Sequence, residues 1–272
     1  MEEQWKYYNH ALIPTTAPHE KVNVFNKTLF KKKWGGVPLL ARWTEDFDCG
    51  YETEWWYVIK DTPLDLSKLK KKRRYEINKG NKNFDVKVID AKKYIDEIIS
   101  TTKKAYKSWP EKYRPNVNQN EMRKDIIKWD KFKVFGCIDK ETKEFCGYAL
   151  ITEHKDYAEF NVLRVDPQKE KRSINAAIVF AIVKEYENKL SNGFYINDGS
   201  RAIRHETAFQ DYLEKYFEFR KAYCKLAIKY RFPINIIIKI LFPFRNIITK
   251  DSKLGSLIYS LLNMEKMRRN CQ

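Results

Sequence analysis

The sequence is poor in cysteine, and its five cysteines form no CxxC pair. They are Cys49, Cys137, Cys146, Cys224 and Cys271, an odd number in a chain that is too long to need disulfides for stability. Secreted domains that depend on disulfides are short and carry even sets of cysteines. The cysteine content therefore predicts reduced thiols and a cytoplasmic protein.

Long apolar runs are also missing. No stretch approaches the ~20 uninterrupted apolar residues of a membrane-spanning helix. The start, MEEQWKYYNH, is charged and lacks the apolar core of a secretory signal. We expect a protein that does not span a membrane and is not secreted by an obvious route.

Motifs for nucleotides and metals are absent in the same way. There is no GxGxxG and no Walker loop, and the four histidines show no ligand spacing. His205-Glu206 starts like a zincin helix, but the second histidine is lacking. The sequence therefore predicts no metal site.

The chain is rich in positive charge and in apolar residues. Its 53 Lys and Arg against 36 Asp and Glu give a formal charge of +17, and 43% hydrophobic residues suffice for the core of one large or two small domains. A positive field favours polyanions, coenzyme phosphates, tRNA or an anionic lipid leaflet, without selecting among them.

Periodicity and turn residues predict a definite order of elements. Residues 1–60 read as an irregular extension followed by strands around the turn at Asp48-Cys49-Gly50. Residues 61–231 read as helix, strand, helix, helix, three strands, helix, strand, helix and strand, and residues 232–272 as an amphipathic tail. Glycines end two of these helices in this interpretation, the first at Gly80 and the helix capped by Ser173 at Gly193.

Two stretches resemble the GNAT acyltransferase superfamily. VLRVDPQKEKRSINAAIVFAIVKEY, residues 162–186, is similar to the fourth strand, donor loop and following helix of that fold, and ETAFQDYLEKYFEFRKAYCKLAIKY, residues 206–230, to its closing helix and strand. EWWYVIKDTPLDLSKLKKKRRYEINKGNKNF, residues 54–84, looks like the segment that leads into the second half of FemAB-like proteins. The resemblance covers roughly residues 51–230 and implies an α/β (α+β) fold, a mixed central sheet flanked by helices.

The resemblance implies an acyl-CoA donor between the strand 157–165 and the strand 193–197. Its phosphates would lie at the helix that follows Ser173, because a helix N-terminus attracts anions. The residues implied in donor binding are Val162, Leu163, Arg164, Val165, Lys169, Lys171, Arg172 and Ser173. The chain departs from the family here, since QKEKRSI contains no glycine where the GNAT loop is glycine-rich.

Acyl transfer to an amine needs a base for the ammonium proton. Glu159 lies on the strand beside the expected donor, and Asp198 lies where the next strand ends, so both are candidate catalytic residues. A structural role remains the alternative for each, because Asn197-Asp198-Gly199 is also a common turn composition. The GNAT tyrosine acid has no clean match, since Tyr212 stands two positions too early.

The most highly charged stretch is KLKKKRRYEINKG, residues 68–80. At 100° per residue Arg73 shares the apolar stripe of Leu69 and Ile77, whereas Lys71 and Lys72 point away. Arg73 is therefore a candidate for holding a phosphate or carboxylate of the acceptor, together with Arg201. A solvated basic face and a grip for nucleic acid remain the alternatives.

The tail FPINIIIKILFPFRNIITKDSKLGSLIYSLLNMEKMRRN contains apolar runs that basic residues interrupt. Its periodicity puts Ile234, Ile237, Ile238 and Leu241 on one side, which fits a helix lying on an anionic membrane surface. A tail packed on the protein body, or a dimer contact, is the alternative.

These patterns lead to one hypothesis and two rivals. The hypothesis is a cytoplasmic acyltransferase, peripheral at the inner membrane face, that moves an acyl group from acyl-CoA to an amine of a phosphorylated or lipid-linked cell-envelope precursor. The rivals are a FemAB-type transferase that uses aminoacyl-tRNA and a catalytically inactive GNAT-fold module that binds nucleic acid or membrane.

Overall fold

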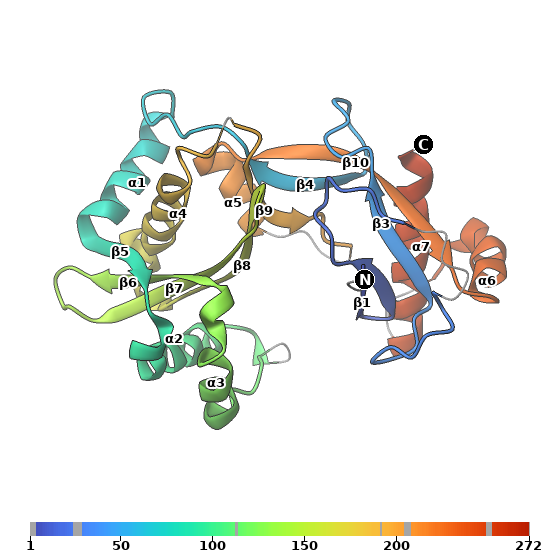
Figure 1. Ribbon diagram of the computed structural model, residues 1–272, viewed down its shortest axis with the longest axis horizontal. Helices are drawn as coiled ribbons and strands as arrows, with labels where there is room; N and C mark the ends of the chain where they lie inside the picture. The colour runs from blue at the N-terminus through green and yellow to red at the C-terminus, as the bar shows by residue number, and fades with distance from the viewer. Residues whose placement is uncertain are drawn as a thin grey trace. The chain divides into compact units, whose positions relative to one another are not determined.

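The computed structural model describes residues 4–23, 29–111, 114–190, 192–203, 208–248 and 252–271. Within these ranges the chain is a mixed α/β protein with ten strands and flanking helices (Figure 1). The predicted fold class, a mixed sheet flanked by helices, is confirmed.

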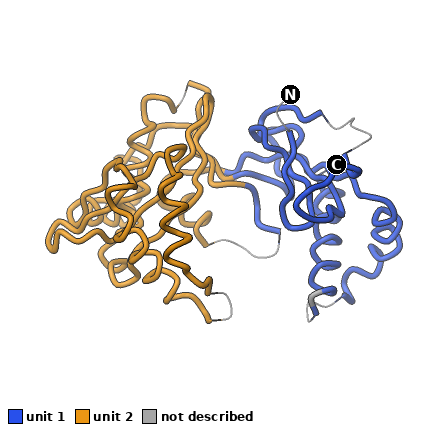
Figure 2. The backbone as a smooth tube through the Cα atoms, turned by 60° about the horizontal axis from the view of Figure 1, so that its bottom comes forward, with its two compact units in different colours: residues 1–57, 200–207, 221–272 blue, residues 58–199, 208–220 orange. Residues whose placement is uncertain are grey.

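The chain divides into two compact units (Figure 2). Unit 1 contains residues 1–57, 200–207 and 221–272, and unit 2 contains residues 58–199 and 208–220. The strands β4 (Trp55–Lys60) and β10 (Arg220–Tyr230) each have residues in both. This division differs from the expected boundaries after residues 60 and 231, because both ends of the chain build unit 1.

Unit 2 is built on strands β5 (Phe84–Ile89), β6 (Lys133–Asp139), β7 (Phe145–Glu153), β8 (Tyr157–Val165) and β9 (Tyr195–Ser200). Their order is β9-β8-β7-β6-β5, antiparallel from β5 to β8 and parallel between β8 and β9. The three-stranded meander predicted over residues 131–166 is confirmed. It follows from the alternation of the strand sequences and from turns at Asp139–Lys143 and His154–Asp156.

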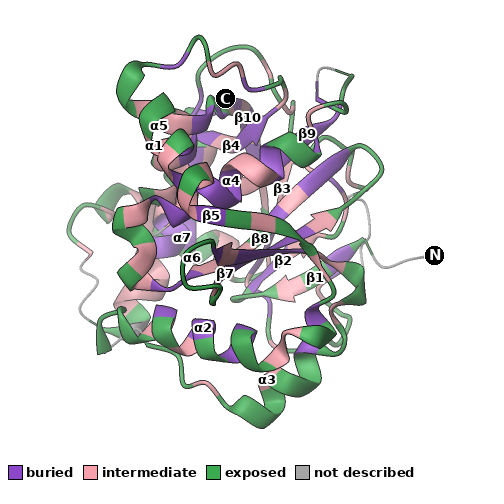
Figure 3. Ribbon diagram, turned by 90° about the vertical axis from the view of Figure 1, so that its left-hand side faces the viewer, coloured by how far each residue is buried: buried purple, intermediate pink, exposed green. Residues whose placement is uncertain are grey.

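Helices cover both faces of these strands. On one face α2 (Ile95–Lys107) and α3 (Gln119–Ile126) pack through Ile98, Ile99 and Ile126 on Tyr148 and Leu150 of β7. Figure 3 shows α2 with its buried residues turned toward the strands. On the other face α4 (Ile174–Glu185) places Ile174 and Ile178 against Gly147, and α1 (Lys71–Asn83) packs on α4.

Two predicted helix ends differ from the structure. Helix α1 begins at Lys71. It continues through Gly80 to Asn83. A Cβ on Gly80 would lie 2.6 Å from the Ser173 carbonyl oxygen, so this glycine allows two helices to touch rather than ending one.

Helix α4 ends earlier than predicted. Its last residue is Glu185, and Gly193, with φ +80°, lies in the turn before β9. A positive φ is easily adopted by glycine, so Gly193 serves the turn before β9 and does not mark the end of α4. The helix α5 (Ala208–Phe217) and the single strand β10 after it agree with the predicted closing elements.

Unit 1 combines strands from both ends of the chain. The order β1 (Trp5–Tyr8), β2 (Ala11–Pro14), β3 (Leu40–Glu45), β10 is antiparallel, parallel and antiparallel. Helices α6 (Ile234–Leu241) and α7 (Lys253–Asn270) pack on these strands through Ile238, Leu261, Leu262 and Met264. The alternative of a tail packed on the body therefore holds for α7 and for one side of α6.

Candidate active site in unit 2

The strands β8 and β9 separate soon after they meet (Figure 1). Their parallel register contains three pairs, Tyr157 with Tyr195, Ala158 with Ile196 and Glu159 with Asn197. Both strands continue further, β8 to Val165 and β9 to Ser200. The backbone edges therefore part at the position where the sequence predicted an acyl donor.

The two candidate bases lie on opposite faces of these strands. Side chains alternate along a strand, so Glu159 shares a face with its register partner Asn197, and Asp198 points the other way. Helix α5 confirms the second face, because Phe209 packs edge-on against Phe160 at 5.6 Å between ring centres. The structure thus does not bring Glu159 and Asp198 together.

Asp198 has the more unusual environment of the two. Burial raises the pKa of its carboxyl to about 7, against a hydrogen bond from the Gln210 side chain that lowers it. Gln210 also donates from Nε2 to the Gly199 carbonyl at 3.4 Å, which ties α5 to the end of β9. A carboxyl with this pKa exchanges its proton near neutral pH, as a general base or acid must.

The predicted donor-binding residues of β8 lie along the separated part of the strand. Val162 packs into the core under α2 and α3, and Val165 is buried opposite Gly147. Arg164 points to α2, where its guanidinium lies over the rings of Tyr106 at 5.1 Å and Trp109 at 5.5 Å. It also donates to the Leu163 carbonyl at 2.8 Å, so an arginine held by two aromatic rings borders β8.

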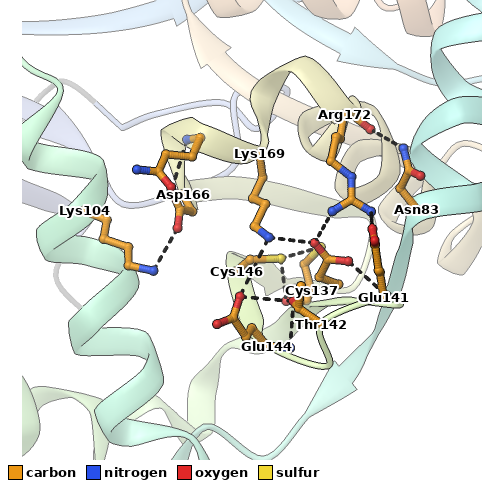
Figure 4. Close-up of polar contacts among 12 residues, drawn as sticks. Asn83, Lys104, Cys137, Glu141, Thr142, Glu144, Cys146, Asp166, Lys169 and Arg172 are labelled. Atoms are coloured by element: carbon orange, nitrogen blue, oxygen red, sulfur yellow. Dashed lines mark hydrogen bonds and ion pairs between the residues drawn. The ribbon is translucent and has the colours of Figure 1, made fainter.

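Two predicted phosphate-binding cations are engaged by a buried aspartate. Lys169 Nζ lies 2.8 Å and Arg172 Nη1 2.5 Å from Oδ2 of Asp139, which is fully buried at the end of β6. Figure 4 shows Lys169 and Arg172 reaching from the segment after β8 toward the β6–β7 hairpin. Burial alone would raise the pKa of Asp139, but bonds from Lys169 and the Glu141 amide and the charge of Arg172 hold it at about 2.

The remaining predicted cation, Lys171, is exposed, and its carbonyl accepts from Lys79 Nζ of α1 at 2.7 Å. Ser173 stands at the N-cap position of α4 with φ +67°, and its hydroxyl donates to the Glu76 carboxylate of α1 instead of capping the helix. A carboxylate thus lies near the helix start where a phosphate was expected, which is favourable for the helix dipole.

The two predicted acceptor-binding arginines belong to different units. Arg73 on α1 is half-buried, and its side chain makes no ion pair or hydrogen bond with the residues that the structure describes. Arg201 belongs to unit 1, where it lies over the Trp56 ring at 4.4 Å and donates to the Glu54 carbonyl at 2.8 Å.

Sequence reasoning missed three residues that shape this region. Gln210 acts on Asp198, Glu76 receives Ser173, and Asp139 holds the segment after β8. The strongest available signal was Asp139, an acidic residue at the end of an apolar strand with basic residues expected nearby. The sequence pattern Thr207-x-x-Gln210 is typical of a capping box at the start of α5, of which Thr207 lies outside the described residues, and it gave no sign of the contact between Gln210 and Asp198.

The described residues contain no group of three or more His, Cys, Asp or Glu side chains arranged to hold a metal ion. His205 and Glu206 lie outside the described residues.

Comparison with known proteins gives distant likenesses only. No family model and no curated protein matches this chain. Among solved structures, the L-PGS from Bacillus licheniformis is similar over 77% of this chain and 67% of that one, with 13% identity and a TM-score of 0.46. The C-terminal DUF2156 domain of a proposed lysylphosphatidylglycerol synthetase from Agrobacterium fabrum is similar over 75% and 67%, with 11% identity and a TM-score of 0.45.

The PaiA N-acetyltransferase of Thermoplasma acidophilum, in complex with coenzyme A, is similar over 39% of this chain and 73% of that one, with 13% identity and a TM-score of 0.32. Superpositions this loose assign the chain to no family and carry no activity over to it. The GNAT-type order of elements is seen in unit 2 itself, in the antiparallel meander, the parallel β8–β9 pair and the helix between them. The FemAB-like branch stays a prediction.

Proposed function

We propose that unit 2 is an acyltransferase, which moves an acyl group from a donor held between β8 and β9 to an amine. The observation that carries the proposal is Asp198, the fourth residue of β9 and the first beyond those paired with β8, a carboxyl whose pKa burial raises to about 7. A proton acceptor active near neutrality therefore stands at the opening of the strands.

The chemistry assigns one proton transfer to Asp198. The acceptor enters as an ammonium ion, and Asp198 in its ionised form takes a proton from it. The free amine then attacks the acyl carbonyl carbon and the bond to the donor's leaving group breaks. The leaving group departs as an anion and takes up the proton that the nitrogen loses as the amide forms. A carboxylate of pKa about 7 removes this proton more effectively than an ordinary aspartate of pKa ~4.

The proposed donor is acyl-CoA, and the proposed acceptor is an amine of a phosphorylated or lipid-linked cell-envelope precursor. The separated edge of β8 gives a donor's amides a strand to pair with. Arg73 supports an anionic acceptor, because it is half-buried and its guanidinium forms no ion pair with a described side chain. A guanidinium in that condition is suited to a bidentate bond with phosphate or carboxylate.

One observation favours aminoacyl-tRNA as a second candidate donor. Asp139 already forms ion pairs with Lys169 and Arg172, and Glu76 lies at the start of α4, so the pyrophosphate of coenzyme A meets fewer free donors than the sequence suggested. The exposed basic residues of α1, Lys71, Lys72 and Arg74, remain available to a longer polyanion.

Turnover of each donor class tests the proposal directly. The full chain is assayed with an acyl-CoA series, following thiol release in the presence of amines, and separately with aminoacyl-tRNAs, following loss of the ester. Asp198→Asn is expected to lower turnover about 10²- to 10⁴-fold. The matched control is Asp211→Asn, an exposed aspartate of α5, which should retain full turnover.

The wild-type rate should rise through pH 7 as Asp198 ionises. Equal turnover in the Asp198→Asn and Asp211→Asn variants would remove Asp198 from the mechanism. Absence of turnover with both donor classes would favour an inactive binding module.

A further inference from the structure

Helix α6 in unit 1 is apolar over more than half of its circumference, and only part of this apolar surface is buried. The inner side contains three of the four residues that periodicity placed toward a membrane: Ile238 is buried, and Ile234 and Leu241 pack beside it on the strands and α7. The fourth residue, Ile237, is exposed. The outer side carries Ile236, Ile237 and Ile240, with exposed fractions of 45%, 42% and 62%. At 100° per residue these three fall within one third of the helix circumference.

The outer side continues beyond the helix. Phe244 and Ile247 follow at spacings of four and three residues in a helical turn, and both are exposed. We call Ile236, Ile237, Ile240, Phe244 and Ile247 the α6 outer face. Figure 1 shows α6 beside α7 at the periphery of unit 1.

This face concentrates exposed apolar surface. Fourteen large hydrophobic side chains are exposed among the described residues, and seven of them lie between Phe232 and Leu254. The other seven are scattered from Tyr8 to Ile127. Single exposed apolar residues need no explanation, but a gathered set of this kind marks an interaction surface.

The charges around the face select its partner. Four basic residues, Lys229, Arg231, Lys239 and Arg245, are described between Lys229 and Leu254, and the sequence adds Lys250, Lys253 and one acidic residue, Asp251, whose side chains the structure does not describe. Lys239 is exposed within the apolar set, and Arg245 lies over the Phe242 ring at 4.6 Å. Isoleucine and phenylalanine on one side of a short helix, bordered by cations, form the pattern that inserts shallowly into an anionic lipid interface.

We propose that the α6 outer face docks unit 1 on the surface of an anionic membrane. The segment does not cross the bilayer, because no helix in the described part of the chain is long and apolar enough to span one. Docking combines burial of the outer isoleucines with the attraction of nearby basic residues for lipid headgroups. The inner side of α6 stays on the strands, so the helix docks as part of a folded unit. This inference is independent of the transfer chemistry proposed for unit 2.

The test is sedimentation of the full chain with large vesicles at low and high salt. Vesicles of phosphatidylcholine alone are compared with vesicles containing about 30 mol % phosphatidylglycerol, a charge density sufficient for a strong negative surface potential. The expected result is sedimentation with the anionic vesicles, much less with phosphatidylcholine, and release as salt rises, because salt screens the charges.

Two matched pairs of variants locate the contact. Ile240→Glu should reduce the vesicle-bound fraction at least about fivefold, whereas Val37→Glu should leave it unchanged. Val37 is 61% exposed and belongs to unit 1 outside the face, against 62% for Ile240. Lys239→Gln should weaken binding to anionic vesicles alone, while Lys6→Gln, at an exposed lysine of β1, should not. A thermal melt of each variant checks that the fold is kept.

Three outcomes overturn the proposal. The first is absence of binding to anionic vesicles at low salt. The second is equal binding of the Ile240→Glu and Val37→Glu variants, and the third is a vesicle-bound fraction that does not change with salt concentration. Light scattering adds a fourth: if the wild type is a dimer that Ile240→Glu converts to a monomer, the face is covered by a second copy of the chain.

Discussion

The end of the β6–β7 hairpin and the opening between β8 and β9 each hold one aspartate of unit 2, and the two surroundings have opposite effects. Asp139 is fully buried between Lys169 and Arg172, and its pKa is held at about 2. Asp198 is half-buried beside Gln210, and its pKa is raised to about 7. Burial raises the pKa of both carboxyls, so the difference comes from their partners: two cations lower the pKa of Asp139, and Asp198 has only the amide of Gln210 among the described residues.

The difference separates a carboxylate fixed by ion pairs from one whose pKa would permit proton transfer near neutral pH. A carboxylate that is always ionised and held by two cations fixes the segment after β8 but cannot exchange a proton near neutral pH. A carboxyl at pKa about 7 stabilises the fold less and is suited to proton transfer. The substitutions below remove one of the two carboxyls or change the partner of Asp198.

The largest effect is expected from Asp139→Asn. The change leaves Lys169 and Arg172 beside a neutral group, so we expect the free energy of unfolding at pH 7 to fall by about 3 kcal/mol. The pKa of Asp139 is about 2 in the folded protein and ~4 in the unfolded chain. The ionised carboxylate therefore stabilises the fold fully above pH ~4. This stabilisation is lost as the pH falls from ~4 toward 2.

Urea unfolding at pH 7 and pH 3 measures this effect, and the gap between wild type and variant should narrow at the lower pH. Asp130→Asn is the control, since Asp130 forms an exposed ion pair with Lys92 at 2.7 Å. It should cost at most about 1 kcal/mol. A similar small loss for Asp139→Asn would contradict the assigned role of the buried pair.

Asp198→Asn should raise the free energy of unfolding at high pH, whereas Asp139→Asn should lower it. A carboxyl with a raised pKa favours the folded state while it is neutral, so wild-type stability falls as the pH rises from ~4 to ~7. At pH 8 the asparagine variant should be more stable by about 2 kcal/mol, a value reduced for the partial exposure of the side chain. At pH 4 the two proteins should unfold alike in urea, and a variant less stable at pH 8 would show that Asp198 is ionised without penalty.

Gln210→Lys gives Asp198 a cation of the kind that Asp139 has. We expect the pKa of Asp198 to fall by about 1 unit or more, so the acidic limb of the rate profile, or the carboxyl carbon resonance, should move to lower pH. Asp211→Lys adds the same charge on the exposed side of α5 and should move neither. An unmoved titration in Gln210→Lys would mean that its ammonium group does not reach Asp198.

The sequence predicted best the elements whose pattern is local. The meander from β6 to β8 follows from alternating residues and turn residues, and helix α4 follows from the helical spacing of Ile174, Ile178 and Ile182, although Val179 and Val183 on its other sides are buried as well. Both ends of the predicted donor loop were located correctly. The helix ends at Gly80 and Gly193 were not, because a glycine that permits a helix contact has the same sequence signal as one that ends a helix.

The contacts of the candidate site depend on residues far apart in the chain. Lys169 and Arg172 look available in the sequence, yet their partner Asp139 is about thirty residues away on another strand. The environment of Asp198 likewise depends on the packing of α5. Periodicity grouped Ile237 with Ile234, Ile238 and Leu241, whereas Ile237 is exposed in the structure and the other three pack on the strands and α7. The apolar arc of α6 is wider than the surface that these neighbours cover, and the sequence pattern does not show which part is covered.

The contact at Gly80 has a mechanical consequence. Two helices that meet through side chains can slide or roll by repacking them, but α1 meets the first turn of α4 through backbone, with no side chain between Gly80 and the Ser173 carbonyl. Lys79 and Asn83 add bonds to the carbonyls of Lys171 and Arg172 on either side. Displacement of α1 must therefore displace the start of α4 and the segment after β8 as well. We expect the helix that bears Arg73 and the segment after β8 to move together as one rigid group.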